Sequence, residues 1–112
     1  MDIIGKYKLL KFEKKNLGNV KLVKAIDKLL DDITSSNWQS QTELIKDRKD
    51  ADCVHNDGFY FFDINVHRTL VLIIFEENEA IIQWIGTHGD YESTFKNNKK
   101  KQLKLGLEIK DK

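Results

Sequence analysis

Residues 59–91, FYFFDINVHRTLVLIIFEENEAIIQWIGTHGDY, decide the fold of this chain. The stretch contains three apolar runs of strand length, at 59–64, 68–75 and 80–85. Short turns at 65–67 and 76–79 separate these runs, and strands joined so closely pair antiparallel. A further strand is expected at 53–55, ahead of a turn at 56–58. The pattern therefore predicts an antiparallel sheet in the second half of the chain.

The first half of the chain has a helical period instead. Apolar residues at spacings of three and four across 20–33 predict an amphipathic helix that buries Leu22, Val23, Ile26, Leu29, Leu30 and Ile33. A shorter helix is expected at about 6–15, with Tyr7 and Leu10 as its buried positions and Leu9 and Phe12 as further candidates for burial. A third helix is expected at about 41–46. The predicted fold class is α+β, in which an N-terminal helical hairpin packs on one face of the antiparallel sheet.

Length and composition indicate a single domain, residues 1–112, of globular type. No apolar run reaches the roughly 18 to 20 residues that cross a bilayer, and residues 1–6 lack the layout of a signal peptide. We therefore expect a cytoplasmic protein without a membrane segment. The single cysteine, Cys53, agrees with that compartment because it cannot form an internal disulfide.

The charge of the chain is unevenly distributed. The net charge is +1, but residues 1–95 contain 12 Lys and Arg against 16 Asp and Glu, whereas residues 96–112 contain seven Lys against two acids. We expect a basic C-terminal extension at about 96–112, helical to about residue 101. Its lysines either contact phosphates or form the solvated end of a helix. The candidate phosphate-binding residues are Lys96, Lys99, Lys100 and Lys101.

A cluster of polar side chains follows the strand expected at 80–85. Gly86 is expected to end that strand and to place the next residues on the rim of the sheet. Arg68 opens a neighbouring strand, so its cation can face the same rim. Cleavage of a phosphodiester without a metal needs a base, an acid and positive charge on the phosphate. Imidazole, phenol and guanidinium groups can supply these, which makes the candidate catalytic residues His88, Tyr91 and Arg68.

Each candidate catalytic residue also has a purely structural alternative. His88 could cap the end of the sheet or the start of a helix, and Tyr91 could belong to the core. Arg68 could form an ion pair with a nearby carboxylate: Asp63, Glu79 or Asp90.

Four further residues are candidates for supporting roles at the rim. Asp90 could hold His88 in one tautomer, or only complement the dipole of a helix. Thr87 is better suited to an N-cap than to catalysis. His55 and His67 could reach the same rim, or lie exposed in turns.

Metal and cofactor sites are not expected from the sequence. Cys53 and His55 with His67 or His88 offer ligand types, but not the paired spacings of a zinc site. The chain also lacks a Gly-rich phosphate loop and a Gly-x-Ser-x-Gly elbow. The expected chemistry is therefore independent of metal and cofactor.

Residues 84–91, WIGTHGDY, contain the most specific motif of the chain, Gly-Thr-His-x-x-Tyr after an apolar pair. Residues 54–64 read as a Val-x-Asn-Asp turn followed by an aromatic-rich strand, and residues 65–68 as Asn-x-His-Arg. Together these segments resemble the HigB family of bacterial toxins, within the RelE/ParE-like superfamily. The chain departs from the family pattern at His67, where tyrosine is usual, and at Asp63, where asparagine is usual.

The resemblance implies a RelE-like toxin of a type II toxin-antitoxin system. Such toxins are mRNA interferases, endoribonucleases that cleave messenger RNA, usually on the translating ribosome, and so inhibit translation and growth. A cognate helix-turn-helix antitoxin, similar to HigA, silences them. The wider superfamily also implies two alternatives: a ParE-like toxin that binds a protein such as gyrase, and a non-catalytic RNA-binding module.

Overall fold

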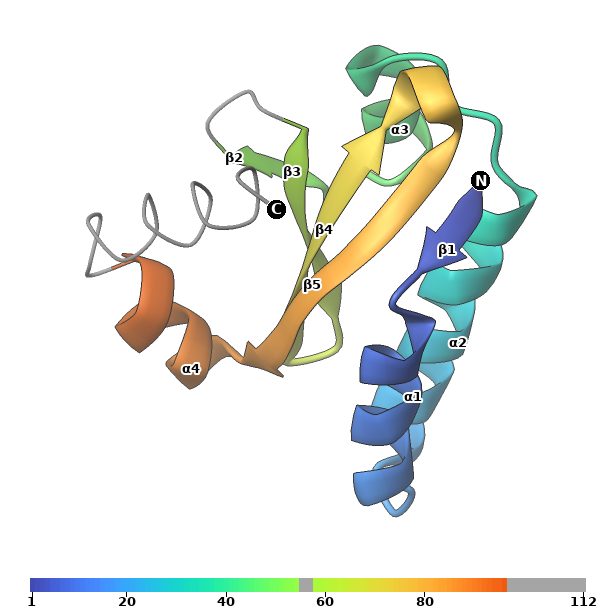
Figure 1. Cartoon of the computed structure of the whole chain (residues 1–112). Helices are drawn as coiled ribbons and strands as arrows, with labels where there is room; N and C mark the ends of the chain where they lie inside the picture. The colour runs from blue at the N-terminus through green and yellow to red at the C-terminus, as the bar shows by residue number, and fades with distance from the viewer. Residues whose placement is uncertain (55–57, 97–112) are drawn as a thin grey trace.

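The computed structural model describes residues 1–54 and 58–96, and Figure 1 shows how their helices and strands are arranged. Helices dominate the first half of the chain and strands the second, which confirms the α+β class. The described elements, in chain order, are β1 Asp2–Ile4, α1 Lys6–Lys15, α2 Val20–Ser35, α3 Gln41–Asp47, β2 Asp52–Val54, β3 Phe59–Ile64, β4 His67–Ile74, a 3-10 turn Phe75–Glu77, β5 Glu79–Thr87, α4 His88–Tyr91 and a π-helical turn Glu92–Lys96.

The five described strands form one sheet in the order β1-β5-β4-β3-β2. Strands β2, β3, β4 and β5 pair antiparallel, as their short connections predicted. Strand β1 pairs with β5 in parallel, so the expectation of a purely antiparallel sheet is wrong. Most of the chain separates β1 from β5, and for this reason no short turn restricts their relative direction.

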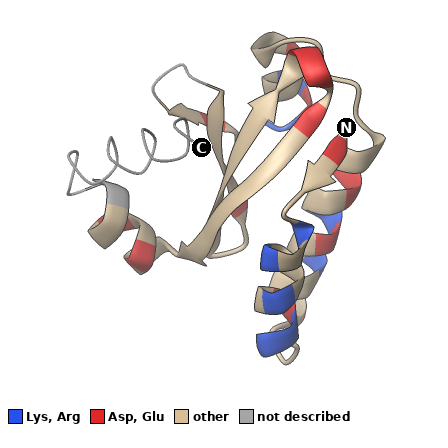
Figure 2. Ribbon diagram, viewed as in Figure 1, with Lys and Arg blue, Asp and Glu red and all other residues tan. Residues whose placement is uncertain are grey.

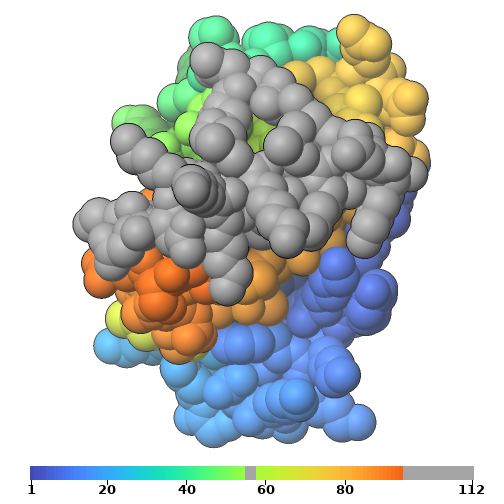
Figure 3. Space-filling model, turned by 60° about the vertical axis from the view of Figure 1, so that its left-hand side comes forward, coloured from blue at the N-terminus to red at the C-terminus, as the bar shows by residue number. Residues whose placement is uncertain are grey.

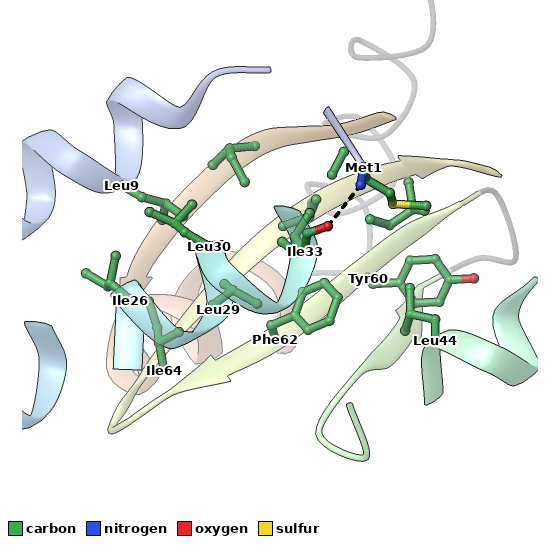
Figure 4. Close-up of a cluster of buried hydrophobic side chains, with 14 of the residues drawn as sticks. Met1, Leu9, Ile26, Leu29, Leu30, Ile33, Leu44, Tyr60, Phe62 and Ile64 are labelled. Atoms are coloured by element: carbon green, nitrogen blue, oxygen red, sulfur yellow. Dashed lines mark hydrogen bonds between the residues drawn. The ribbon is translucent and has the colours of Figure 1, made fainter. Parts of the chain in front are cut away.

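The main core lies between one face of the sheet and the helices (Figure 4). The apolar stripe of α2 is fully buried at Leu22, Ile26, Leu29 and Ile33, where the period of the sequence placed it. Asn19 caps this helix by accepting a hydrogen bond from the backbone of Leu22 at 3.1 Å. The same core contains residues of β3 and β5, including Tyr60, Phe62, Ile64, Ala80 and Ile82.

Helix α1 contributes less to the core than its sequence suggested. Tyr7 and Leu10, expected on the buried side, are 67% and 44% exposed, so that expectation is wrong. The two further candidates are confirmed: Leu9 is buried, and Phe12 packs partly against the same core. Each apolar pair is spaced by three residues and so shares a helix face, but the two pairs lie on different faces. Packing against the sheet selects one face and leaves the other exposed to solvent.

The opposite face of the sheet carries a second, smaller apolar cluster. Phe59, Phe61 and Leu70 are buried there, and Trp84 and Tyr91 pack against them. Alternation along a strand explains why β3 serves both clusters, since successive side chains point to opposite faces. Figure 1 shows α4 beyond the end of β5, on the side of the sheet away from α1 and α2. This second face therefore carries the side chains next to the expected rim.

Gly86 lies within β5, which continues to Thr87, so the expectation that this glycine ends the strand is wrong. The pairing of β5 with β4 skips Gln83, and this bulge shifts the register just before Trp84. Trp84 and Gly86 lie two residues apart, on the same face of the strand. A Cβ atom at position 86 would lie 2.5 Å from the Trp84 ring and 3.1 Å from the Cβ of Asp90. The glycine is therefore required for space between the tryptophan and α4.

We expect the substitution Gly86→Ala to destabilise the protein by about 1 to 3 kcal/mol, because the added methyl group must displace the Trp84 ring. Gly18→Ala is the matched control, since no atom lies within 4 Å of a Cβ at that position. The control should be neutral or slightly stabilising. Urea unfolding followed by tryptophan fluorescence measures both changes. Equal midpoints for the two variants would contradict the packing described for Gly86.

Candidate active site

The rim begins where β5 passes directly into α4. The Thr87 hydroxyl accepts a hydrogen bond from the backbone N–H of Asp90 at 3.0 Å, and the Asp90 carboxylate accepts one from the backbone N–H of Thr87 at 3.1 Å. This reciprocal capping box confirms Thr87 as the N-cap of α4. His88 follows as the first residue of the helix, exposed, and its backbone N–H donates to the carbonyl of Val66 at 3.2 Å. The capping box and the hydrogen bond to Val66 therefore fix the backbone at His88.

Arg68 projects from β4 onto the second face of the sheet, beneath Tyr91. Its guanidinium carbon lies 4.6 Å from the centre of the Tyr91 ring and 5.5 Å from that of Phe61. The side chain is only 14% exposed. Contacts of this kind between a cation and aromatic rings are stronger when water is excluded. The guanidinium is thus fixed as a flat group between aromatic rings.

Carboxylates also hold Arg68. Its Nε donates to Asp63 Oδ1 at 2.9 Å, and its terminal nitrogen lies 3.6 Å from Asp52 Oδ2. Burial by itself lowers the pKa of Arg68, but the hydrogen bond and charge of Asp63 outweigh burial, so the pKa is raised. The structural alternative of an ion pair with Asp63 is therefore confirmed, and it coexists with the position of Arg68 at the rim.

Tyr91 connects the two other candidate catalytic residues. Its ring lies above Arg68, contacts Phe61 edge to face at a centroid distance of 4.9 Å, and lies 6.3 Å from the His88 ring. The structural alternative for Tyr91, a place in the core, is confirmed in part, because the ring packs against the second apolar cluster. The structure brings His88, Tyr91 and Arg68 together at the end of the sheet. The group offers an imidazole, a phenol and a buried cation within one small region.

His67 occupies the other face of the sheet from Arg68. It is buried, so the expectation of an exposed turn histidine is wrong, and its ring contacts Phe12 of α1 at a centroid distance of 5.3 Å. Its Nδ1 has no hydrogen-bond partner among the described residues. Burial lowers the pKa of His67, and the opposing charge of Asp90 does not offset this effect. His67 is therefore a neutral side chain behind the rim at neutral pH.

The remaining candidates cannot be placed in the same way. His55 lies outside the described residues, as do Lys99, Lys100 and Lys101. The backbone at Lys96 belongs to the π-helical turn after α4. The basic C-terminal helix expected to about residue 101 falls mainly beyond the part of the chain that the structure describes.

The family comparison agrees with this fold. Residues 22–94 match the family model HigB_toxin, described as the RelE-like toxic component of a toxin-antitoxin system. The chain belongs to the HigB toxin family. No curated protein matches the chain. The matched range of this toxin extends from within α2 to the turn after α4, and so contains all three candidate catalytic residues.

Two negative findings concern the described parts of the toxin. None of the helices there has the length and apolar character required to cross a membrane. In residues 1–54 and 58–96, no three side chains of His, Cys, Asp or Glu are grouped as a potential metal site.

The sequence reasoning missed Arg48, which lies beneath the site. This buried residue donates to Asp32 at 3.0 Å, to Asp50 at 2.7 Å and to the backbone carbonyl of Asp63 at 3.3 Å. Asp50 in turn accepts the backbone N–H of Asp63 at 2.9 Å. Asp63 therefore joins the Arg48 network to Arg68. Composition could have indicated this role of Arg48. The toxin has 17 lysines and only two arginines, and arginine is the cation that suits buried ion pairs.

We expect Arg48→Ala to destabilise the toxin by about 3 to 5 kcal/mol, because two carboxylates then lose their buried partner. Lys49→Ala is the matched control, since Lys49 is exposed and adjacent. Chemical unfolding monitored by circular dichroism measures the difference. A loss no larger than that of the control would show that the network contributes little to stability.

Proposed function

We propose that this toxin is an endoribonuclease that cleaves messenger RNA without a metal ion. The observation that carries the proposal is the position of the Arg68 guanidinium, 4.6 Å from the Tyr91 ring, with exposed His88 one helical turn before that tyrosine. A proton-exchanging group and a fixed cation at one solvent-accessible rim suit a reaction at a phosphodiester. Membership of the HigB family supports the same reaction.

The proposed reaction is an attack of the 2′-hydroxyl oxygen on the adjacent phosphorus. The hydroxyl proton leaves to a base, a bond forms between the 2′-oxygen and phosphorus, and the bond from phosphorus to the 5′-oxygen breaks. An acid protonates the departing 5′-oxygen. The products are a 2′,3′-cyclic phosphate and a 5′-hydroxyl end. In this scheme His88 exchanges one of the two protons, since histidine is the side chain best suited to proton exchange near neutral pH.

Tyr91 and Arg68 have complementary parts in the scheme. The Tyr91 phenol shares the proton transfer or orients the phosphate. The Arg68 cation stabilises the negative charge that builds up on the phosphate oxygens, and its fixed position avoids reorganisation during the reaction. Asp63 supports this role because it fixes the Nε edge of the guanidinium and does not occupy the terminal nitrogens, one of which lies 3.6 Å from Asp52 Oδ2.

Supporting residues complete the proposed site. The capping box of Thr87 and Asp90 fixes the turn that presents His88. His67 packs behind the rim, and His55 is proposed to lie near it. Additional RNA contacts are assigned to the basic C-terminal extension: Lys96, Lys99, Lys100 and Lys101.

The partners follow from the proposed reaction. Messenger RNA is the substrate, cleavage takes place on the translating ribosome, and the working compartment is the cytoplasm. A cognate helix-turn-helix antitoxin, similar to HigA, silences the toxin. It does so either by covering the rim of Arg68 and His88 or by holding the toxin sterically off the ribosome. A toxin-antitoxin complex with an open, ribosome-accessible rim would count against both modes.

Induction of the toxin alone in bacteria tests the proposed function. Growth should stop, and transcripts should acquire new 5′ ends within coding regions. Arrest with intact transcripts would contradict nuclease activity and favour a ParE-like toxin that grips a protein such as gyrase. Absence of both arrest and cleavage would favour a non-catalytic RNA-binding module.

A further inference from the structure

Charge is segregated within the described chain in a way that its small net charge conceals. Residues 6–24, which comprise α1, the connection and the start of α2, contain seven lysines and one acid, Glu13. Residues 25–95 contain five Lys and Arg against 14 Asp and Glu. Figure 2 shows the basic residues along α1 and the acidic residues distributed over the rest of the ribbon. We call residues 6–24 the basic segment.

Within residues 1–54 and 58–96, acidic side chains form no ion pairs with the lysines of the basic segment. The ion pairs in these ranges involve Lys28, Arg48 and Arg68 instead. The one acid of the segment, Glu13, is directed at Asp27, and burial together with that neighbour raises its pKa. The positive charge of the segment is therefore available to a polyanion.

The basic segment runs along the edge of β5 toward the rim. Lys8 Nζ donates to the carbonyl of Gln83 at 3.3 Å, and one turn later Phe12 contacts His67, which pairs with Thr87. Helix α1 thus follows β5 in the direction that leads to His88. Lys11 and Lys15 lie three and seven residues after Lys8, on the same side of the helix. These lysines form a row of cations along β5, and Figure 3 shows the surface of α1 (blue) next to that of β5 (orange).

We infer that the basic segment binds the phosphate backbone of the single-stranded RNA whose scissile bond lies at the rim. The identity of the polyanion rests on the proposed function. Tyr7, 67% exposed on α1, adds an aromatic surface on which a base can stack. A basic stripe with an exposed aromatic ring is the electrostatic footprint of nucleic-acid binding. Most of the segment precedes residues 22–94, so the family match does not account for it.

Salt-dependent RNA binding by the full chain tests the inference. The probe is a single-stranded RNA with 2′-O-methyl groups, which cannot undergo the proposed cleavage. The test variant carries Lys11→Gln, Lys14→Gln and Lys15→Gln; the control carries Lys28→Gln, Lys46→Gln and Lys49→Gln, and all six lysines are exposed. Both variants lose the same charge. Glutamine preserves helix propensity, and thermal unfolding verifies that both variants are folded.

The test variant should bind RNA about 10- to 100-fold more weakly than the wild type near ~0.1 M salt, and the slope of log affinity against log salt should fall by about 2. The control should bind within about threefold of the wild type and keep its slope. Equal losses in the two variants would overturn the inference, as would equally tight binding of poly-glutamate to the wild type, because that would indicate an acidic protein as the partner.

A parallel cleavage assay with unmodified messenger RNA on translating ribosomes separates this inference from the proposed function. If the wild type cleaves RNA but the test variant binds it normally, the proposed nuclease stands and the inference fails. If the basic segment binds RNA but no cleavage occurs, the inference stands and the proposed nuclease fails.

Discussion

Replacement of His88 by alanine is expected to reduce RNA cleavage by about 10²- to 10⁴-fold, the range typical of the loss of a positioned acid or base. The side chain is exposed, so its removal leaves no cavity in either apolar cluster. The capping box of Thr87 and Asp90 remains intact in this variant. The fold should therefore survive while the chemistry is lost. Cleavage rates and the unfolding midpoint, measured on the same preparation, separate these two effects.

Ser93→Ala is the matched control for His88→Ala. Ser93 is also exposed and lies in the turn that follows α4, where its hydroxyl donates to the carbonyl of Asp90 at 3.2 Å. Its loss should leave cleavage within about twofold of the wild type, because a single exposed hydrogen bond contributes little. Full cleavage and full toxicity in His88→Ala would remove His88 from the proposed site.

Removal of the Arg68 cation should have the second-largest effect. We expect Arg68→Ala to reduce cleavage by about 10²- to 10³-fold, since a preorganised positive group at the phosphate is lost. The carboxylate of Asp63 then lies unpaired next to the phosphate and repels it. Arg68→Lys should recover only part of the activity, because an ammonium group has neither the flat shape that packs on Tyr91 nor the forked donors of arginine.

A double variant distinguishes a chemical role of Arg68 from a structural one. Adding Asp63→Asn to Arg68→Ala should restore part of the lost cleavage, since it removes the unpaired carboxylate while keeping the shape of the side chain. Asp52→Asn should have little effect, because Asp52 is 56% exposed and lies 3.6 Å from the guanidinium. If Arg68→Ala lost stability but retained cleavage, Arg68 would be a structural residue only.

Periodicity accounts for the parts of the fold that the sequence predicts well. Helix α2 and strand β3 each have a dominant local pattern, and their observed bounds differ little from the predicted ones. Short turns also determine the antiparallel pairing of β2 with β3, of β3 with β4 and of β4 with β5. These features depend on neighbours in the chain, which is why a single sequence suffices for them.

Features that depend on distant contacts were not predictable in this way. The parallel pairing of β1 with β5 involves residues from the two ends of the described chain. The choice of Leu9 over Tyr7 and Leu10 as the buried position of α1 depends on the sheet edge beside it. The space that Gly86 leaves for Trp84 depends on the bulge in β5. None of these contacts has a local signature.

The candidate site was only partly predictable for the same reason. Motif and spacing indicated His88, Tyr91 and Arg68, and also the N-cap role of Thr87. The contact of the Arg68 guanidinium with the Tyr91 ring requires α4, which follows β5, to pack against β4. The spacing of residues in the sequence does not reveal this packing. The network of Arg48 beneath Asp63 links a loop, a helix and a strand, and sequence distance hides it.

The ends of the cleaved RNA test the central claim most directly. Purified toxin is incubated with messenger RNA on translating ribosomes, and the product ends are identified by mass spectrometry. Wild-type toxin should produce 2′,3′-cyclic phosphate and 5′-hydroxyl ends, and His88→Ala should produce almost none. Products with 5′-phosphate ends, or equal yields from His88→Ala, would contradict metal-independent catalysis at the rim of His88, Tyr91 and Arg68.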